Sequence, residues 1–290
     1  MSDSLEGLRR KLNGVEQLGS VVRAMKAVSA SSIVQYEGAV EALGQYQHSV
    51  ELALSLCLRE EPPVATRRIT ATNIPTAALI FGSDQGLVGC FNEVIGEFAL
   101  QALRKRPGPK TVWAVGERVC PLLQAAGISV SKRFIVPASV AAITPLVTQI
   151  QIEIEGYTAN GRYSEVLVFH NAPRAAGRYE GASQRLLPLD EAWYRRLRQM
   201  PWPNAQGAQV LGDPSACLHA LVHEQLFISL YRACAESLAS ENASRLEAMQ
   251  RAEENIERVS DDLRRSASRL RQSSIDEELF DVVAGFNALT

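Results

Sequence analysis

Apolar residues recur at intervals of three, four or seven positions along the last third of the chain, with charged residues between them. This spacing keeps one narrow apolar stripe on one side of a helix, as in coiled coils. Residues 215–284 contain no glycine and no proline, the residues that most often stop a helix. The pattern predicts one helix about 100 Å long, which must lie along a partner. The stripe consists of Leu246, Met249, Ile256, Val259, Leu263, Leu270, Ile275, Leu279, Val282, Phe286 and Leu289.

A second long helix is predicted over residues 4–58, with Ser4 as its N-cap and Glu60-Glu61-Pro62-Pro63 ending it. Glycines weaken it as an isolated helix, yet they also permit close approach of another helix. The similar periods at the two ends predict an antiparallel helix pair. The stripe of this helix is Leu5, Leu8, Leu12, Val15, Leu18, Val22 and Met25.

Between the two helices, short apolar runs alternate with segments of helical spacing. Strands are predicted at 76–81, 111–115, 128–136 and 164–170, and helices at 91–106, 117–126 and 140–157. Residues 184–213 contain prolines and are predicted to be irregular, as a wrap or hairpin that leads into the last helix. The alternation predicts an open α/β sheet, parallel in part. The predicted domains are a coiled-coil helix (1–60), an α/β globular domain (61–212) and a second coiled-coil helix (213–290).

Composition fits a protein that buries a core, with 46% hydrophobic and 21% charged residues among 290. The net charge of -2 gives no indication of a basic face for nucleic acid. No apolar run approaches the roughly 20 residues that span a bilayer. The first residues lack the layout of a secretory signal, which predicts a protein kept in the cytoplasm.

Few residues suggest catalysis or metal binding. His219 and His223 lie four apart, but Glu224 stands outside the pair, unlike the His-Glu-x-x-His order of zinc metalloproteases. No serine occupies a Gly-x-Ser-x-Gly elbow. We therefore predict no catalytic residue, no metal site and no cofactor. The cysteines are predicted to be reduced thiols with small buried side chains: Cys57, Cys90, Cys120, Cys217 and Cys234.

The loop from Gly82 to Asn92 follows the first predicted strand, a position that suggests a nucleotide site. Its glycines do not follow Gly-x-Gly-x-x-Gly, and the chain contains no Gly-x-x-x-x-Gly-Lys-Ser/Thr sequence. We interpret the loop as a tight strand-to-helix turn in which glycine permits positive φ. Nucleotide binding by a stand-alone α/β protein is the alternative.

Three stretches, in family order and spacing, resemble the γ subunit of F-type ATP synthases. The first is Leu8-Arg9-Arg10-Lys11-Leu12 with Val22-Arg23-Ala24-Met25-Lys26-Ala27-Val28-Ser29-Ala30-Ser31. The second, Ser83–Asn92, is similar to the family's Ser-Asp-x-Gly-Leu-x-Gly-x-Phe/Leu-Asn loop. The third is Ser240–Met249, followed by Arg271–Ile275 and Val283-Ala284-Gly285.

The resemblance implies a central rotor shaft with no active site of its own. The two terminal helices would enter a catalytic ring of three α and three β subunits. The α/β domain would lie at the base, against the ε subunit and the membrane-embedded c-ring. Ion flow through the c-ring would turn the shaft and drive ATP synthesis, or the reverse. The protein would be peripheral, on the cytoplasmic face of a bacterial plasma membrane.

The resemblance also implies which residues contact other subunits. Met25, Lys26, Arg271 and Gln272 would contact the catalytic ring near its moving β segments. Met25 also falls on the apolar stripe, so a place in the coiled-coil core is an equal alternative. Lower on the shaft would lie Glu241, Asn242 and Arg245. The apolar end, Phe280, Val282, Val283, Phe286 and Leu289, is consistent with a tip held in an apolar collar.

The chain departs from the family pattern after Ser31, where Ser32–Glu37 replaces a basic run. Asp276-Glu277-Glu278 also makes the tip more acidic than expected. These departures favour a divergent γ subunit from a second operon. A free-standing coiled-coil scaffold is a further alternative to the shaft.

Overall fold

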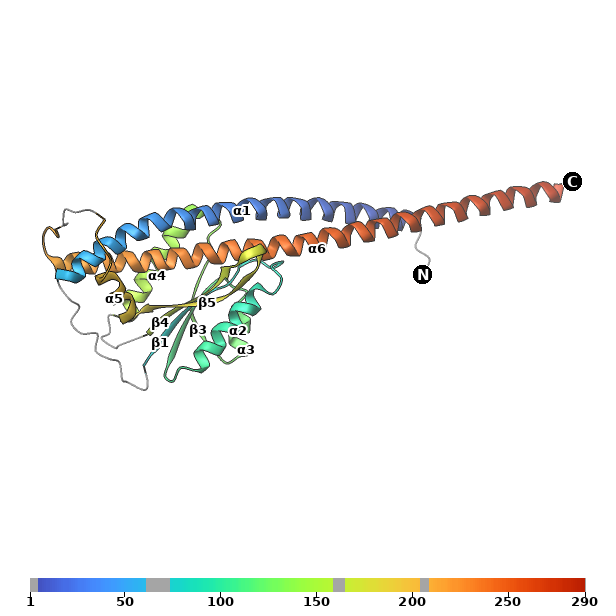
Figure 1. The fold of residues 1–290 in the computed structure, drawn as a ribbon. Helices are drawn as coiled ribbons and strands as arrows, with labels where there is room; N and C mark the ends of the chain where they lie inside the picture. The colour runs from blue at the N-terminus through green and yellow to red at the C-terminus, as the bar shows by residue number, and fades with distance from the viewer. Residues whose placement is uncertain (1–4, 61–73, 159–164, 204–208, 290) are drawn as a thin grey trace. The chain divides into compact units, whose positions relative to one another are not determined.

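The computed structural model describes residues 5–60, 74–158, 165–203 and 209–289, with side chains for all of these except 60, 176, 191 and 285–289. The ends of the chain form two long helices, α1 (Leu5–Glu60) and α6 (Pro214–Leu289), as predicted (Figure 1). The suggested cap Ser4 and the stop at Glu61–Pro63 lie outside the described residues, as do the side chains of Phe286 and Leu289.

The chain divides into two compact units. One contains residues 1–30 and 245–290, and the other contains residues 31–244. The domain limits expected from the sequence (1–60, 61–212 and 213–290) stay a prediction. No helix in the described ranges joins the length and the apolar character needed to cross a bilayer.

A five-stranded sheet forms the centre of the larger unit. Its strands are β1 (Thr76–Phe81), β2 (Lys110–Val115), β3 (Val130–Phe134), β4 (Glu165–Pro173) and β5 (Tyr179–Leu187). They lie in the order β3-β2-β1-β4-β5. Neighbours among the first four are parallel, and β5 runs antiparallel to β4. The predicted open, partly parallel α/β sheet is confirmed.

Each face of the sheet is covered by helices, because parallel strands expose apolar side chains on both faces. On one face, α2 (Phe91–Arg104) and α3 (Cys120–Ala125) pack over a core that includes Ile80 and Phe169. On the other, α4 (Ile143–Thr158) and α6 pack over Leu79, Trp113 and Val168. A short 3-10 turn, Val140–Ala142, leads into α4, so the predicted helix over 140–157 is nearly complete.

A third apolar cluster joins α1 to the start of α6 within this unit. Leu54 and Leu58 of α1 are fully buried there with Ile228 of α6 and Leu197 of α5 (Glu191–Arg198). The terminal helices therefore meet in a third cluster as well as contributing to one of the sheet cores, in which Tyr36 of α1 and Leu230 of α6 are buried.

The prediction that residues 184–213 are irregular is wrong for two segments. Strand β5 continues to Leu187, and α5 occupies Glu191–Arg198. Strand β5 lies at the edge of the sheet and leaves Ser183, Gln184 and Arg185 exposed, so it lacks the apolar run of a buried strand. Helix α5 begins at Asp190, whose carboxylate accepts a hydrogen bond from the Ala192 amide at 3.2 Å.

Candidate functional site

The smaller unit is an antiparallel pair made by the first part of α1 and the last part of α6. Lys26 Nζ lies 2.6 Å from Glu253 Oε2, and Arg264 Nη2 lies 3.0 Å from Glu16 Oε1. From the first pair to the second, the residue on α1 lies nearer the N-terminus and its partner on α6 lies nearer the C-terminus. These contacts confirm the predicted antiparallel arrangement.

The register of this pair differs from the predicted stripes at one residue in each helix. Leu18 and Val259 are exposed, at 59% and 45%. Their neighbours Gly19 and Ser260 are buried instead. The residues of α6 that face α1 form a contact line with steps of three and four. This spacing is kept although it brings a polar residue, Ser260, into the line, because helix geometry decides which positions face the partner. The members of the line are Met249, Glu253, Ile256, Ser260, Leu263, Ala267 and Leu270.

The two helices approach each other closely where Gly19 faces α6. A Cβ at Gly19 would lie 3.3 Å from Ile256 Cγ2, so the two helices are close there. A cavity of about 370 Å³ lies beside this point, lined by Gly19, Ile256, Ser260 and the charged residues around them. Of the α1 glycines with a tested Cβ position, Gly14, Gly38 and Gly44 have nothing within 4 Å. Close helix approach is therefore confirmed at Gly19 and is wrong for those three.

Beyond Leu270, α6 has no covering from α1. Every side chain from Arg271 to Ala284 is exposed, and the C-terminal end of α6 runs past the start of α1 (Figure 1). Ile275, Leu279 and Val282 lie four and three residues apart on this segment, with exposures of 52%, 60% and 70%. An apolar stripe on a bare helix indicates a surface that another molecule covers.

The residues predicted to contact other subunits fall into three settings. Arg271 and Gln272 are exposed on the bare end of α6. Met25 is half-buried, and Lys26 reaches Glu253 across the helix pair. In the larger unit Glu241 and Asn242 are buried, with Asn242 Nδ2 donating to Leu238 O at 2.9 Å. Arg245 is half-buried. Their contacts with other subunits stay predictions.

The loop Gly82–Asn92 closes the carboxyl ends of three parallel strands. The Asp84 carboxylate accepts hydrogen bonds from the Glu117 amide at 3.0 Å and the Val136 amide at 2.8 Å, which follow β2 and β3. Asn92 accepts a bond from the Ser83 amide at 3.0 Å and donates one to Ser83 Oγ at 2.9 Å. The Ser-Asp…Asn part of the motif therefore fastens strand ends together.

The same loop is attached to α6 through small hydroxyl side chains. Ser244 Oγ donates a hydrogen bond to Val88 O and lies 3.1 Å from the Tyr179 hydroxyl. Ser240 Oγ donates to Asn171 O at 2.9 Å, and Asn171 Nδ2 donates to Phe91 O at 2.9 Å. This chain of bonds explains why two serines stand on a buried face of α6. The sequence pattern alone does not indicate this role for Asn171, Tyr179 or Ser240.

Only part of the predicted reason for the loop glycines holds. Gly89 has a φ of +54°, but Leu87, a non-glycine, also has a positive φ of 62°. Gly82 is required by space, because a Cβ there would lie 2.8 Å from Val119. Likewise a Cβ on Gly116 would lie 2.7 Å from the Ser83 backbone. Within the loop, positive φ therefore accounts for Gly89 and close packing for Gly82, whereas Gly86 has neither a positive φ nor a close contact.

Several titratable side chains among the described residues form ion pairs, including those of both His170 and His223. His223 Nε2 lies 3.0 Å from Glu155 Oε1, which accounts for one of the two helical histidines. Over the described residues, no three potential metal ligands gather in one place. Burial raises the pKa of the Cys120 and Cys234 thiols. Cys90 is exposed and Cys217 half-buried, so the prediction that all cysteines are buried is wrong for these two.

Comparison with known proteins was consistent along nearly the whole chain. The family model described as ATP synthase matches residues 4–289. The chain is 28% identical to the ATP synthase gamma chain of Frankia casuarinae, over 100% of this chain and 99% of that one. It is 24% identical to the gamma chain of Lachnoclostridium phytofermentans, with 99% of both covered.

Solved structures share the fold. The rotor of the Euglena gracilis mitochondrial ATP synthase matches with a TM-score of 0.62 and 13% identity, over 93% of this chain and 98% of that one. The central stalk and c-ring structure from Tetrahymena thermophila matches with a TM-score of 0.56 and 22% identity, over 80% and 99%. Since the family model spans all but the extreme ends, the chain belongs to the ATP synthase family, and its relatives there are gamma chains.

Proposed function

We propose that this chain is the central rotor shaft of an F-type ATP synthase, a non-catalytic γ subunit that couples ion flow through a c-ring to ATP synthesis or hydrolysis. The observation that carries the proposal is the bare apolar end of α6, on a chain whose full length matches gamma chains. A helix with exposed apolar side chains needs a surrounding partner, and a catalytic ring supplies one.

Such a shaft acts mechanically. A ligand or partner shifts a two-state element only through contacts that differ between the states. An asymmetric helix pair that turns inside a ring presents a different side to each β subunit in turn. The shaft thus changes nucleotide affinity in the β subunits without a catalytic group of its own.

We assign roles to the predicted contact residues on the same basis. Arg271 and Gln272, exposed beyond the end of α1, would contact the ring near its moving β segments. Met25 and Lys26 would contact it from the other helix, with Lys26 kept in place by Glu253.

The larger unit would lie at the base of the shaft, against the ε subunit and the c-ring. Glu241, Asn242 and Arg245 would support that lower region. The protein would then be peripheral, on the cytoplasmic face of a bacterial plasma membrane, and would bind no nucleic acid.

Co-purification tests the proposal. The tagged chain would be recovered from mildly solubilised membranes of its host, and ATP hydrolysis measured in the recovered material. Recovery of α and β subunits with ATPase activity supports the shaft. A chain recovered alone, or as a homodimer with bound nucleotide, would instead favour the stand-alone nucleotide-binding protein or the coiled-coil scaffold.

Variants on the bare end of α6 sharpen the test. Arg271→Ala is expected to lower ATP hydrolysis by the assembled complex. Arg265→Ala removes an equally exposed arginine from the segment before Leu270 and serves as the matched control. Equal activity of the two variants would remove the proposed role of Arg271.

The departure from the basic run after Ser31 motivates the proposal of a second-operon γ subunit. Expression of this chain in cells that lack their main γ subunit tests it. Poor rescue of growth is expected, since the positive charge at that height of the helix is missing. Full rescue would contradict the second-operon assignment and leave the shaft itself intact.

A further inference from the structure

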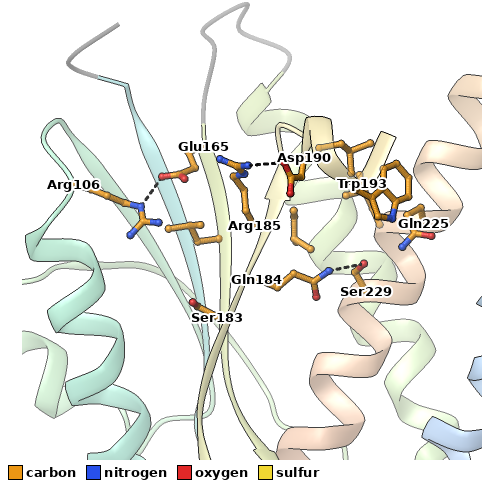
Figure 2. Close-up of a pocket in the computed structure, with 13 residues that line it drawn as sticks. Arg106, Glu165, Ser183, Gln184, Arg185, Asp190, Trp193, Gln225 and Ser229 are labelled. Carbon is orange, nitrogen blue, oxygen red and sulfur yellow. Dashed lines mark hydrogen bonds and ion pairs between the residues drawn. The ribbon is translucent and has the colours of Figure 1, made fainter. Parts of the chain in front are cut away.

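A cavity of about 470 Å³ lies in the larger unit, beside the last residues of β5 (Figure 2). Its walls come from one end of the β4–β5 pair, where the start of β4 lies beside the end of β5, and from the arginine after α2, the segment that leads into α5 with Trp193 of α5, and the start of α6. The cavity is lined by no residue of the loop Gly82–Asn92.

The cavity follows the free edge of β5. Four consecutive residues of this strand, 183–186, line it. Successive residues of a strand point to opposite faces of the sheet, and β5 pairs regularly with β4 as far as Arg185, so a cavity that touches Ser183, Gln184 and Arg185 passes along the edge. Figure 2 shows Ser183 on the side of Arg106 and Glu165, and Gln184 on the side of Ser229.

The edge of β5 is open for pairing. Among the described strands, β5 is the last in the sheet and pairs with β4 alone. Ser183, Gln184 and Arg185 are exposed. Alternate residues of an edge strand point their amide and carbonyl groups away from the sheet, where an added strand can bind them.

A buried side chain in the wall has an unused acceptor. Gln225 is 6% exposed, and its Oε1 has no hydrogen-bond partner among the residues that the structure describes. Buried polar atoms are almost always bonded, so an unpaired one facing a cavity indicates a donor supplied from outside. The neighbouring Gln184 Nε2 is already engaged, because it donates to Ser229 Oγ at 3.2 Å.

The charges around the cavity suit a neutral, amide-rich occupant. Arg106 Nε lies 2.7 Å from Glu165 Oε2, and Arg185 Nη2 lies 3.8 Å from Asp190 Oδ1. Each arginine thus stands beside a carboxylate, which disfavours a phosphate or another anion. Trp193 adds an apolar surface at the far end of the cavity (Figure 2).

We infer that this cavity binds an extended polypeptide segment, which adds a strand to β5 and donates a side-chain or backbone hydrogen bond to Gln225 Oε1. The occupant rests on the proposed function, because the segment is taken to belong to another subunit of the same complex. Main-chain bonds to residues 183–185 provide the affinity, and contact with Trp193 and Gln225 selects the sequence.

Hydrogen–deuterium exchange, resolved to single residues, tests this inference on the isolated chain and on the assembled complex. Strand addition is expected to slow exchange at least tenfold in the complex at those amides within 183–185, where β5 pairs regularly with β4, that point away from β4. Alternation is the informative feature, because a partner that packs over the side chains would slow neighbouring amides alike or leave them unchanged.

The variant Gln225→Met tests the acceptor. It removes the unpaired oxygen with little change in volume, so the isolated chain is expected to keep its melting temperature or to gain slightly. In the complex, protection at β5 is expected to fall about fivefold, which corresponds to one lost hydrogen bond. Gln151→Met is the control: Gln151 is equally buried, but its Nε2 donates to His223 O at 3.1 Å. It should destabilise the chain and leave β5 protection unchanged.

The outcomes separate the two proposals. Alternate protection that Gln225→Met weakens supports the strand. Assembly with α and β subunits but unchanged exchange at 183–185 overturns the inference and leaves the shaft in place. Failure of the chain to assemble at all overturns the proposed function and this inference with it.

Discussion

The Asp84 carboxylate is the point at which three strand ends meet, and its removal should loosen the sheet. It accepts two backbone amides, from Glu117 and Val136. A hydrogen bond to a charged acceptor contributes about 1.5–3 kcal/mol, and Asp84 is half-exposed, which lowers that figure. Asp84→Ala should therefore cost about 2–4 kcal/mol of unfolding free energy, because both amides lose their acceptor.

Urea unfolding monitored by Trp113 fluorescence measures this change. Trp113 in β2 is 1% exposed and reports on the sheet directly. The chain has three tryptophans, so the variants would be made with Trp193→Phe and Trp202→Phe in the background. Asp84→Asn keeps one carbonyl oxygen and should lose about half as much, roughly 1–2 kcal/mol.

Asp190→Ala is the matched control. It also removes one carboxylate, but that group accepts a single backbone hydrogen bond of 3.2 Å, as the cap of the eight-residue helix α5, and otherwise forms an exposed ion pair with Arg185 at 3.8 Å. A loss of about 1 kcal/mol or less is expected. If Asp84→Ala unfolded at the same urea concentration as Asp190→Ala, the idea that Asp84 fastens the strand ends would be refuted.

Two further predictions concern the helix pairs. Gly14→Ala should stabilise α1 by about 0.5–1 kcal/mol. Gly19→Ala should stabilise it less or destabilise it, because the added Cβ would press on Ile256. Thermal unfolding of the two variants measures the difference, and equal gains would contradict the close approach of the helices at Gly19. Cys57 Sγ and Cys217 Sγ lie 3.5 Å apart, so a mild oxidant such as diamide should join them in a disulfide. Mass spectrometry of the tryptic peptides would detect the link, with Cys217→Ser as the control. Absence of the link would contradict the pairing of α1 with α6 in the larger unit.

The long helices could be predicted because their stripes repeat over many turns, but their register could not. Leu18 and Val259 were assigned to the apolar stripes because they are hydrophobic, but each lies one residue away from the position that contacts the other helix. A glycine and a serine take their places. Helix geometry fixes which positions meet, and a coiled coil tolerates small or polar residues at a few of them.

Four strands of the sheet, including the edge strand β3, followed from the sequence, whereas the edge strand β5 did not. Strand β1 is buried throughout and reads as a continuous apolar run. Strand β5 alternates weakly and leaves residues 183–185 in water, so its sequence resembles a loop. The role of Asp84 was also beyond sequence reasoning, since its partners Glu117 and Val136 lie far along the chain and only the fold brings them together.

The bare end of α6 bears on how such a protein is made in the cell. Phe280 and Val282 are 72% and 70% exposed, on a helix that α1 leaves uncovered. Before its partners bind, this end exposes apolar surface that other incompletely folded chains can bind. Removal of such surface from water is favourable by about 25 cal/mol per Å². Biogenesis therefore has a preferred order, in which this surface is enclosed early, and cells that make this chain in excess of its partners would accumulate it in aggregates.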